Sequence, residues 1–262
     1  MTSTTSNRAR KIIVGNWKMN PSGPSDAKKI FTKIVAGAGK YKNVEIVVCP
    51  PAVFLGILAA PASTSKLRLG AQDGFYETEG AYTGSISMSM MKSLGAEYVI
   101  VGHSERRNTG ETDEIINKKI KAGLKQGLKI ILCVGEKVHD ENGEYLKVLQ
   151  SQLLQALSGV NKKYFSQIIV AHEPVWAIGA LAKTSDTLES FAHNRLFIKK
   201  VLADIVGKKI GLTIPILYGG SVGLKNSKEF LVAGGADGLL VGRVSLIPDD
   251  FIKIIQVADS LK

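Results

Sequence analysis

Residues 97–136 read EYVIVGHSERRNTGETDEIINKKIKAGLKQGLKIILCVGE, and the succession of patterns in this stretch decides the fold. An apolar run, EYVIVGH (97–103), precedes a segment of helical period, ETDEIINKKIKAGLKQG (111–127), and a second apolar run, KIILCVG (129–135), follows it. Nearly continuous apolar runs are typical of strands that are buried on both faces of a parallel sheet. The stretch therefore predicts a strand, a crossover helix and a second strand parallel to the first.

The same alternation recurs along the chain. The other apolar runs are KIIVGNW (11–17), VEIVVCP (44–50), LRLGAQD (67–73), QIIVAHE (167–173), IPILYGG (214–220) and DGLLVGR (237–243). Eight strand-helix units in 262 residues predict a single-domain, closed (β/α)8 barrel over residues 11–262, preceded by a disordered arm at residues 1–10. An open doubly wound sheet is the structural alternative, but no G-x-G-x-x-G follows the first run.

The composition limits the compartment and the class of partner. Cys49 and Cys133 are the only cysteines, and each belongs to an apolar run, which predicts buried free thiols rather than a disulfide or a metal site. No apolar stretch reaches the roughly 18 residues that a membrane span requires, and the first residues lack the apolar core of a signal peptide. We therefore expect a cytoplasmic protein without a membrane partner.

The positive net charge raises the question of nucleic-acid binding. Lysine and arginine number 34 against 23 acidic residues, which gives a formal net charge of +11. The lysines are spread along helical segments, and aromatic residues for base stacking are few. We therefore expect no nucleic-acid partner, although the positive field would attract small anionic substrates.

Polar residues stand where the predicted strands end, and in a barrel these carboxyl ends meet on one rim. They are Asn16, Lys18, Gln72, Asp73, His103, Ser104, Glu105, Glu136 and Glu173. Two Gly-rich turns, YGGSVG (218–223) and VGRVS (241–245), lead into helices, where unpaired N–H groups and the helix dipole favour an anion. The rim thus offers a candidate base, an imidazole, an ammonium and a phosphate site.

Six motifs at six of these strand ends resemble the triosephosphate isomerase family. They are GNWKMN (15–20), VGHSERR (101–107), LCVGE (132–136), EPVWAIG (173–179), LYGGSV (217–222) and ADGLLVG (236–242), in the family's order. The resemblance spans residues 11–262 and implies a TIM barrel enzyme of glycolysis and gluconeogenesis. It would interconvert dihydroxyacetone phosphate and D-glyceraldehyde 3-phosphate without metal or cofactor. It would also form a homodimer through the loop GAYTG (80–84), from Gly80 to Gly84.

The resemblance implies catalytic roles for five residues. Glu173 resembles the family's base, which removes a proton from the carbon beside the carbonyl and returns it to the neighbouring carbon through an enediolate. His103 resembles the family's electrophile, a neutral imidazole at a helix N-terminus that donates to the carbonyl oxygen. Lys18 would supply a fixed positive charge, Asn16 would orient the substrate and Lys18, and Glu105 resembles the carboxylate that engages this lysine.

The resemblance also implies a substrate-binding set and a lid. Side chains and backbone N–H groups would hold the triose phosphate at Asn16, Lys18, Gly179, Ser221, Gly242 and Arg243. A lid that excludes water from the enediolate would consist of Pro174, Val175, Trp176, Ala177, Ile178, Gly179, Ala180, Leu181, Ala182 and Lys183.

Several positions depart from the family pattern. The family typically has Thr-Gly-Lys after the position of Gly179, so either Ala182 occupies the lysine position here or the lid is displaced by one residue. Arg243 replaces the second glycine of the last phosphate loop, and its guanidinium either reinforces the anion site or points to solvent. The other departures replace a usual tyrosine, asparagine and interface glutamate, and they are His172, Asp73 and Ser85.

Two rival functions remain open. Another phosphate-binding barrel enzyme, such as an aldolase or a different sugar-phosphate isomerase or epimerase, would need a Schiff-base lysine or paired acids, and Lys18 is the only lysine of the rim set. A non-catalytic or weakly active binding barrel would keep the fold and lose the chemistry, but Glu173, His103 and Lys18 are all retained. A zinc deaminase is disfavoured because no P-C-x-x-C accompanies His103. The sequence therefore favours an aldose–ketose isomerase.

Overall fold

The computed structural model describes residues 10–140, 142–177 and 186–261, and in them eight parallel strands close a barrel in chain order. The strands are β1 (Lys11–Asn16), β2 (Val44–Cys49), β3 (Leu67–Ala71), β4 (Ala96–Val101), β5 (Lys129–Val134), β6 (Ile168–His172), β7 (Ile216–Tyr218) and β8 (Gly238–Val241). Each strand pairs with the next, and β8 closes the ring by pairing with β1, where Leu239 lies opposite Ile13. The predicted (β/α)8 barrel is confirmed.

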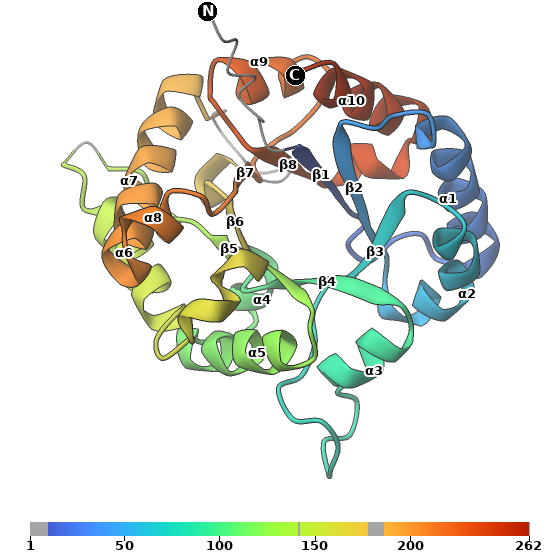
Figure 1. Ribbon diagram of the computed structural model, residues 1–262, viewed down its shortest axis with the longest axis horizontal. Helices are drawn as coiled ribbons and strands as arrows, with labels where there is room; N and C mark the ends of the chain where they lie inside the picture. Colours follow the sequence, from blue (N-terminus) through green and yellow to red (C-terminus); the bar gives the residue numbers. More distant parts are fainter. Residues whose placement is uncertain (1–9, 141, 178–185, 262) are drawn as a thin grey trace, which may run out of the picture.

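Helices surround the ring of strands, as Figure 1 shows. The α-helices are α1 (Pro24–Ala38), α2 (Ala52–Ser63), α3 (Met88–Ser93), α4 (Ser104–Asn108), α5 (Asp113–Lys125), α6 (Tyr145–Ala156), α7 (Leu188–Val206), α8 (Lys208–Gly211), α9 (Ser227–Val232) and α10 (Pro248–Ser260). Short 3₁₀ helices are η1 (Lys162–Gln167), η2 (Val175–Ala177) and η3 (Arg243–Leu246).

Local residues set the boundaries of the unit that the opening stretch predicts. Helix α5 begins after Thr112 because the threonine hydroxyl accepts from the N–H of Ile115. Gly127 follows the helix with a φ of 71°, a left-handed conformation that favours glycine, and β5 begins two residues later. Every fourth residue along one face of α5 is buried, namely Ile116, Ile120 and Leu124.

The sheet separates two layers of core. Alternate strand residues point into the barrel or outward to the helices. The interior cluster consists of Ile12, Val14, Val47, Cys49, Tyr98, Ile100, Ile131, Cys133, Ile169, Ala171, Leu217 and Leu240. Both cysteines are buried and free, as the sequence indicates. Because side chains fill the interior, a substrate can reach the strands only where they end.

Other predictions concern regions outside the barrel. Residues 1–9 of the predicted arm lie outside the described residues, and Arg10 leads directly into β1. None of the described helices is long and apolar enough to cross a membrane. The segment between β3 and α3, which carries GAYTG (80–84), projects beyond the ring of helices and is exposed over residues 77–86 (Figure 1).

Candidate active site

The strand ends bring the predicted catalytic residues to one end of the barrel. Asn16 is the last residue of β1, and Glu173 follows β6 directly. Lys18, two residues after β1, has a φ of 54°, which is rare for residues other than glycine. The Asn16 Oδ1 accepts from the Lys18 N–H at 3.0 Å, and the Gln72 Nε2 donates to the Lys18 carbonyl at 2.8 Å. These bonds hold the strained backbone of Lys18 in place.

Glu173 is almost fully buried, and both of its carboxylate oxygens have partners. Oε2 accepts from the Ser104 N–H at 3.1 Å, and Oε1 lies 3.1 Å from Nε2 of His103. Burial raises the pKa of Glu173, but His103, the Ser104 N–H and Lys18 lower it and together outweigh burial. The net pKa is lowered, so the carboxylate is ionised and able to accept a proton.

Two glycines make room for Glu173. A Cβ atom at Gly135 would lie 1.7 Å from the carbonyl oxygen of Glu173, which is far inside van der Waals contact. A Cβ atom at Gly219 would lie 3.0 Å from the Glu173 Cγ. The absence of side chains at these positions therefore fixes where the carboxylate can sit.

One hydrogen bond sets the tautomer of His103. The N–H of Glu105 donates to Nδ1 at 3.1 Å, so Nδ1 carries no proton and the proton of the neutral ring is on Nε2, toward Glu173. Burial and the charge of Lys18 lower the pKa of His103, whereas the Glu173 carboxylate, with a smaller effect of Glu105, raises it, and the net pKa is raised. The charge of the imidazole therefore depends on how close Glu173 remains.

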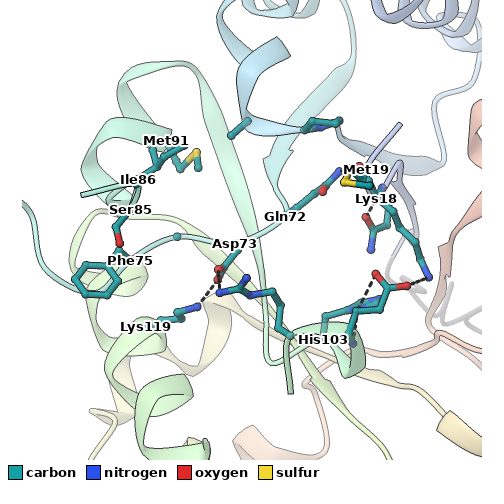
Figure 2. A pocket seen from close by; sticks show the side chains of 17 residues that line it. Lys18, Met19, Gln72, Asp73, Phe75, Ser85, Ile86, Met91, His103 and Lys119 are labelled. Atoms are coloured by element: carbon teal, nitrogen blue, oxygen red, sulfur yellow. Dashed lines mark hydrogen bonds and ion pairs between the residues drawn. The ribbon is translucent and has the colours of Figure 1, made fainter. Parts of the chain in front are cut away.

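Lys18 and Glu105 form the third part of the site. Their Nζ and Oε1 atoms are 2.6 Å apart, with side-chain exposures of 32% and 59%. A half-exposed ion pair contributes little to stability. Its effect is geometric, because Glu105 holds the ammonium of Lys18 on the same side as His103 (Figure 2).

A cavity of about 830 Å³ joins these groups to the Gly-rich turns after β7 and β8. In the first turn, Asn226 accepts from the Gly223 N–H at 2.9 Å and donates to the Ser221 carbonyl at 2.8 Å. In the second turn, the Ser245 hydroxyl donates to the Gly242 carbonyl at 2.7 Å. These bonds fix the backbone of both turns, which suits N–H groups that bind an anion.

Sequence reasoning named Glu136 as a rim residue but missed the buried cluster around it. Its carboxylate accepts from Trp176 Nε1 at 2.8 Å and His172 Nε2 at 3.1 Å, and it lies 3.4 Å from His139 Nδ1. Burial raises the pKa of Glu136, but the His172 and Trp176 donors lower it and outweigh burial. The Glu136 carbonyl also accepts from the Val175 N–H at 3.0 Å. Glu136 therefore anchors the segment that follows the candidate base.

The two histidines of this cluster illustrate what the pattern could and could not reveal. His172 packs on the ring of Phe191, on the opposite side of β6 from Glu173, as strand alternation predicts. The ring of His139 lies 4.1 Å from that of Tyr145 and 5.3 Å from that of Trp176, so this histidine also belongs to the cluster. One feature of the sequence indicates this cluster, because Glu136 lies two residues after β5, close to the position that Glu173 has after β6.

A second charged cluster borders a neighbouring cavity of about 420 Å³. The buried Lys119 Nζ contacts Asp73 at 2.6 Å and Glu111 at 2.8 Å, and Arg106 contacts the same two carboxylates at 3.1 and 3.3 Å. Lys18 and His103 border this cavity on one side (Figure 2). Its opposite side is formed by Phe75, Ser85, Ile86 and Met91 (Figure 2).

Part of the predicted site lies outside the described residues. These positions are Ile178, Gly179, Ala180, Leu181, Ala182 and Lys183. Of the predicted lid, the structure describes Pro174 and η2, in which Ala177 is buried and its carbonyl accepts from the Ser221 hydroxyl at 2.9 Å. Over the described residues, no group of three or more side chains is arranged to hold a metal ion.

Comparisons with known proteins cover nearly the whole chain. The family model described as triosephosphate isomerase matches residues 11–258. A triosephosphate isomerase of Dehalococcoides mccartyi is 44% identical over 250 residues, which cover 94% of this chain and 96% of that protein. The Aquifex aeolicus triosephosphate isomerase is 43% identical, with 94% and 98% covered. The crystal structure of triosephosphate isomerase from Bartonella henselae superimposes with a TM-score of 0.83 at 35% identity, over 95% of this chain and 98% of that one.

Proposed function

Because the chain belongs to the triosephosphate isomerase family, we propose that Glu173 and His103 carry out its interconversion of dihydroxyacetone phosphate and D-glyceraldehyde 3-phosphate. The family and the enzyme class identified from the sequence, an aldose–ketose isomerase, are confirmed. The observation that carries the proposed roles is the 3.1 Å contact between Glu173 Oε1 and His103 Nε2 at the strand ends. A substrate that enters between them meets a base and an N–H donor.

Proton transfer is assigned to Glu173. It removes a proton from the carbon beside the carbonyl, and the carbonyl oxygen becomes the oxygen of an enediolate. The same carboxyl group then returns a proton to the neighbouring carbon, which regenerates the carboxylate. In the same conversion the former carbonyl oxygen takes up a proton from Nε2 of His103, and the hydroxyl on the other carbon returns a proton to that nitrogen and becomes the new carbonyl. A buried carboxylate at the end of a rigid strand suits this role because its position relative to the two carbons is fixed.

Stabilisation of the developing charge is assigned to His103 and Lys18. The Nε2–H of the neutral imidazole donates to the substrate oxygen. A substrate that lies between the imidazole ring and the carboxylate separates His103 from Glu173. The negative charge that raises the pKa of the imidazole is then farther away, while burial and Lys18 still lower this pKa. The ammonium of Lys18 adds a fixed positive charge, which Asn16 and Glu105 position.

The phosphate is assigned to the turns after β7 and β8. Backbone N–H groups of Ser221, Gly242 and Arg243 would bind it, and the side-chain bonds within the turns keep these groups in place before the ligand arrives. The sequence adds the N–H of Gly179, which lies outside the described residues. This cradle would supply binding energy that holds the reacting carbons against Glu173.

A homodimer and a cytoplasmic location complete the proposal. The exposed loop at residues 80–84 projects from the barrel (Figure 1), and a segment of a second copy would enter the cavity beside Lys18. Insertion of Tyr82, which is 44% exposed, into that cavity would bury apolar surface next to the active site. Sedimentation of the full chain against concentration tests this, and a monomer at micromolar concentration contradicts it.

The proposed roles are tested by assay of isomerisation in both directions. Glu173→Asp withdraws the carboxylate by one methylene, so kcat should fall by about 100-fold or more with little change in KM. Glu189→Asp, at an exposed position in the first turn of α7, is the matched control. A Glu173→Asp enzyme as active as the control would refute the role of Glu173, and wild-type protein without turnover would favour a binding barrel.

A further inference from the structure

The cavity of the proposed active site extends beyond the groups that the isomerisation uses. In addition to those groups it is lined by Leu224, Lys225, Asn226, Val244 and Leu246. Its volume of about 830 Å³ lies in the range of cavities that hold drug-sized ligands, which are much larger than a triose phosphate. As far as the described residues line it, the cavity beside the phosphate turns therefore has room for a further group.

Two cations of this region are not neutralised by the cavity's own acids. Glu105 is engaged by Lys18 at 2.6 Å, and Glu173 lies 3.1 Å from His103. Neither Lys225 nor Arg243 takes part in an ion pair within the part of the chain that the structure describes. Both charges are therefore available to a ligand, and the planar guanidinium of an arginine matches two phosphate oxygens at once.

Each of these two cations is adjacent in sequence to a residue of the turns that form the proposed phosphate cradle. Arg243 directly follows Gly242, whose carbonyl is held by the Ser245 hydroxyl at 2.7 Å. Lys225 directly precedes Asn226, which fixes the other turn through its bonds to Gly223 and Ser221. An anion that they bind would therefore lie next to the first phosphate, rather than at the far end of a carbon chain.

We propose that Arg243 and Lys225 form a second anion subsite, which takes the distal phosphate of a ligand with two directly linked phosphates while the cradle holds the proximal one. The proposal rests on the cradle assigned above. It resolves the alternative that the sequence leaves open for Arg243, whose N–H serves the first phosphate and whose guanidinium serves the second. Diphosphate compounds would then compete with the triose phosphates and bind more tightly than monophosphates.

The test compares inorganic pyrophosphate with inorganic orthophosphate on the full-length enzyme. Competitive inhibition of isomerisation and titration calorimetry give the ratio of the two dissociation constants. The variants are Arg243→Ala, Lys225→Ala and the double substitution, and Lys228→Ala is the matched control because this exposed lysine of α9 does not line the cavity. We expect the preference for pyrophosphate to fall by about tenfold in the double variant and to persist in the control.

The possible outcomes separate this proposal from the one on which it rests. An unchanged preference for pyrophosphate in the double variant would overturn the subsite and leave the cradle standing. Equal weakening of orthophosphate and pyrophosphate would also overturn it, because Arg243 would then serve only the first phosphate. If orthophosphate failed to compete with the triose phosphate in the wild type, the cradle itself would be wrong and the subsite with it.

Discussion

Glu136→Gln tests the buried cluster around Glu136, and the contacts of this carboxylate set the size of the expected loss of stability. The carboxylate is buried and accepts from Trp176 Nε1 at 2.8 Å and His172 Nε2 at 3.1 Å. A glutamine has nearly the same shape but presents an NH₂ group where one oxygen was, so one buried N–H loses its acceptor. An unsatisfied buried donor costs about 1–3 kcal/mol, and a hydrogen bond to a charged group contributes about 1.5–3 kcal/mol. We therefore expect the free energy of unfolding to fall by about 3 kcal/mol.

Urea unfolding at a fixed protein concentration, followed by tryptophan fluorescence and far-ultraviolet circular dichroism, measures this difference. Glu144→Gln is the control, because the Glu144 side chain is 63% exposed and its pair with Lys147 at 2.7 Å lies on the surface. Such a pair contributes less than about 1 kcal/mol. If the Glu136 variant lost no more stability than the Glu144 variant, the cluster would not anchor the segment that follows the base.

Three further predictions concern neighbouring contacts. Gly135→Ala places a Cβ atom 1.7 Å from the Glu173 carbonyl, so the base must move and kcat should fall by about 100-fold or more; steady-state kinetics with an unchanged kcat would contradict this. Lys119→Met removes the cation between two carboxylates at 2.6 and 2.8 Å, and unfolding in urea should show a loss of about 3 kcal/mol, whereas an unchanged midpoint would show that Arg106 suffices. The folded pKa values of Glu136 and Glu173 lie below their unfolded values, so the stability that these groups contribute is present above the unfolded pKa, near 4.3, and is lost as pH falls through the folded values. Thermal unfolding between pH 7 and pH 3 should therefore show a smaller loss for Glu136→Gln than for the wild type, and equal losses would contradict the reasoning.

The barrel could be predicted from the sequence because strands that are buried on both faces consist almost entirely of apolar residues. The run QIIVAHE (167–173) contains β6 (Ile168–His172) and ends on the candidate base, and the run KIILCVG (129–135) contains β5 (Lys129–Val134) in the same way. Parallel strands that are covered by helices must be apolar almost throughout. A carboxylate directly after the strand, as at Glu173, or two residues after it, as at Glu136, therefore indicates where the strand ends.

The charged clusters could not be predicted, because residue type does not reveal whether a lysine or a carboxylate is buried. Lys119 belongs to the same helical run as the exposed Lys118 and Lys121, and periodicity alone gives no partner for it. Its contacts with Asp73 and Glu111 join the segment after β3, the segment between α4 and α5, and the middle of α5. Such pairs depend on the register of helix against barrel, which is fixed by packing over the whole fold.

The His-Ser-Glu sequence at 103–105 shows how one short spacing serves two groups of the proposed mechanism. The backbone N–H of Glu105 bonds to Nδ1 of His103 at 3.1 Å and so directs the imidazole proton to Nε2, where any residue with an N–H in this helical turn would do the same. The side chain of Glu105 holds the ammonium of Lys18 at 2.6 Å, and this requires a carboxylate. The position of Glu105, two residues after the histidine, thus sets the tautomer of the imidazole, whereas its carboxylate sets the position of the ammonium. Because both groups stabilise the developing charge in the proposed mechanism, the start of α4 fixes the geometry of charge stabilisation. The proposed base is carried by the end of β6, and the Ser104 N–H at the start of α4 holds its carboxylate at 3.1 Å.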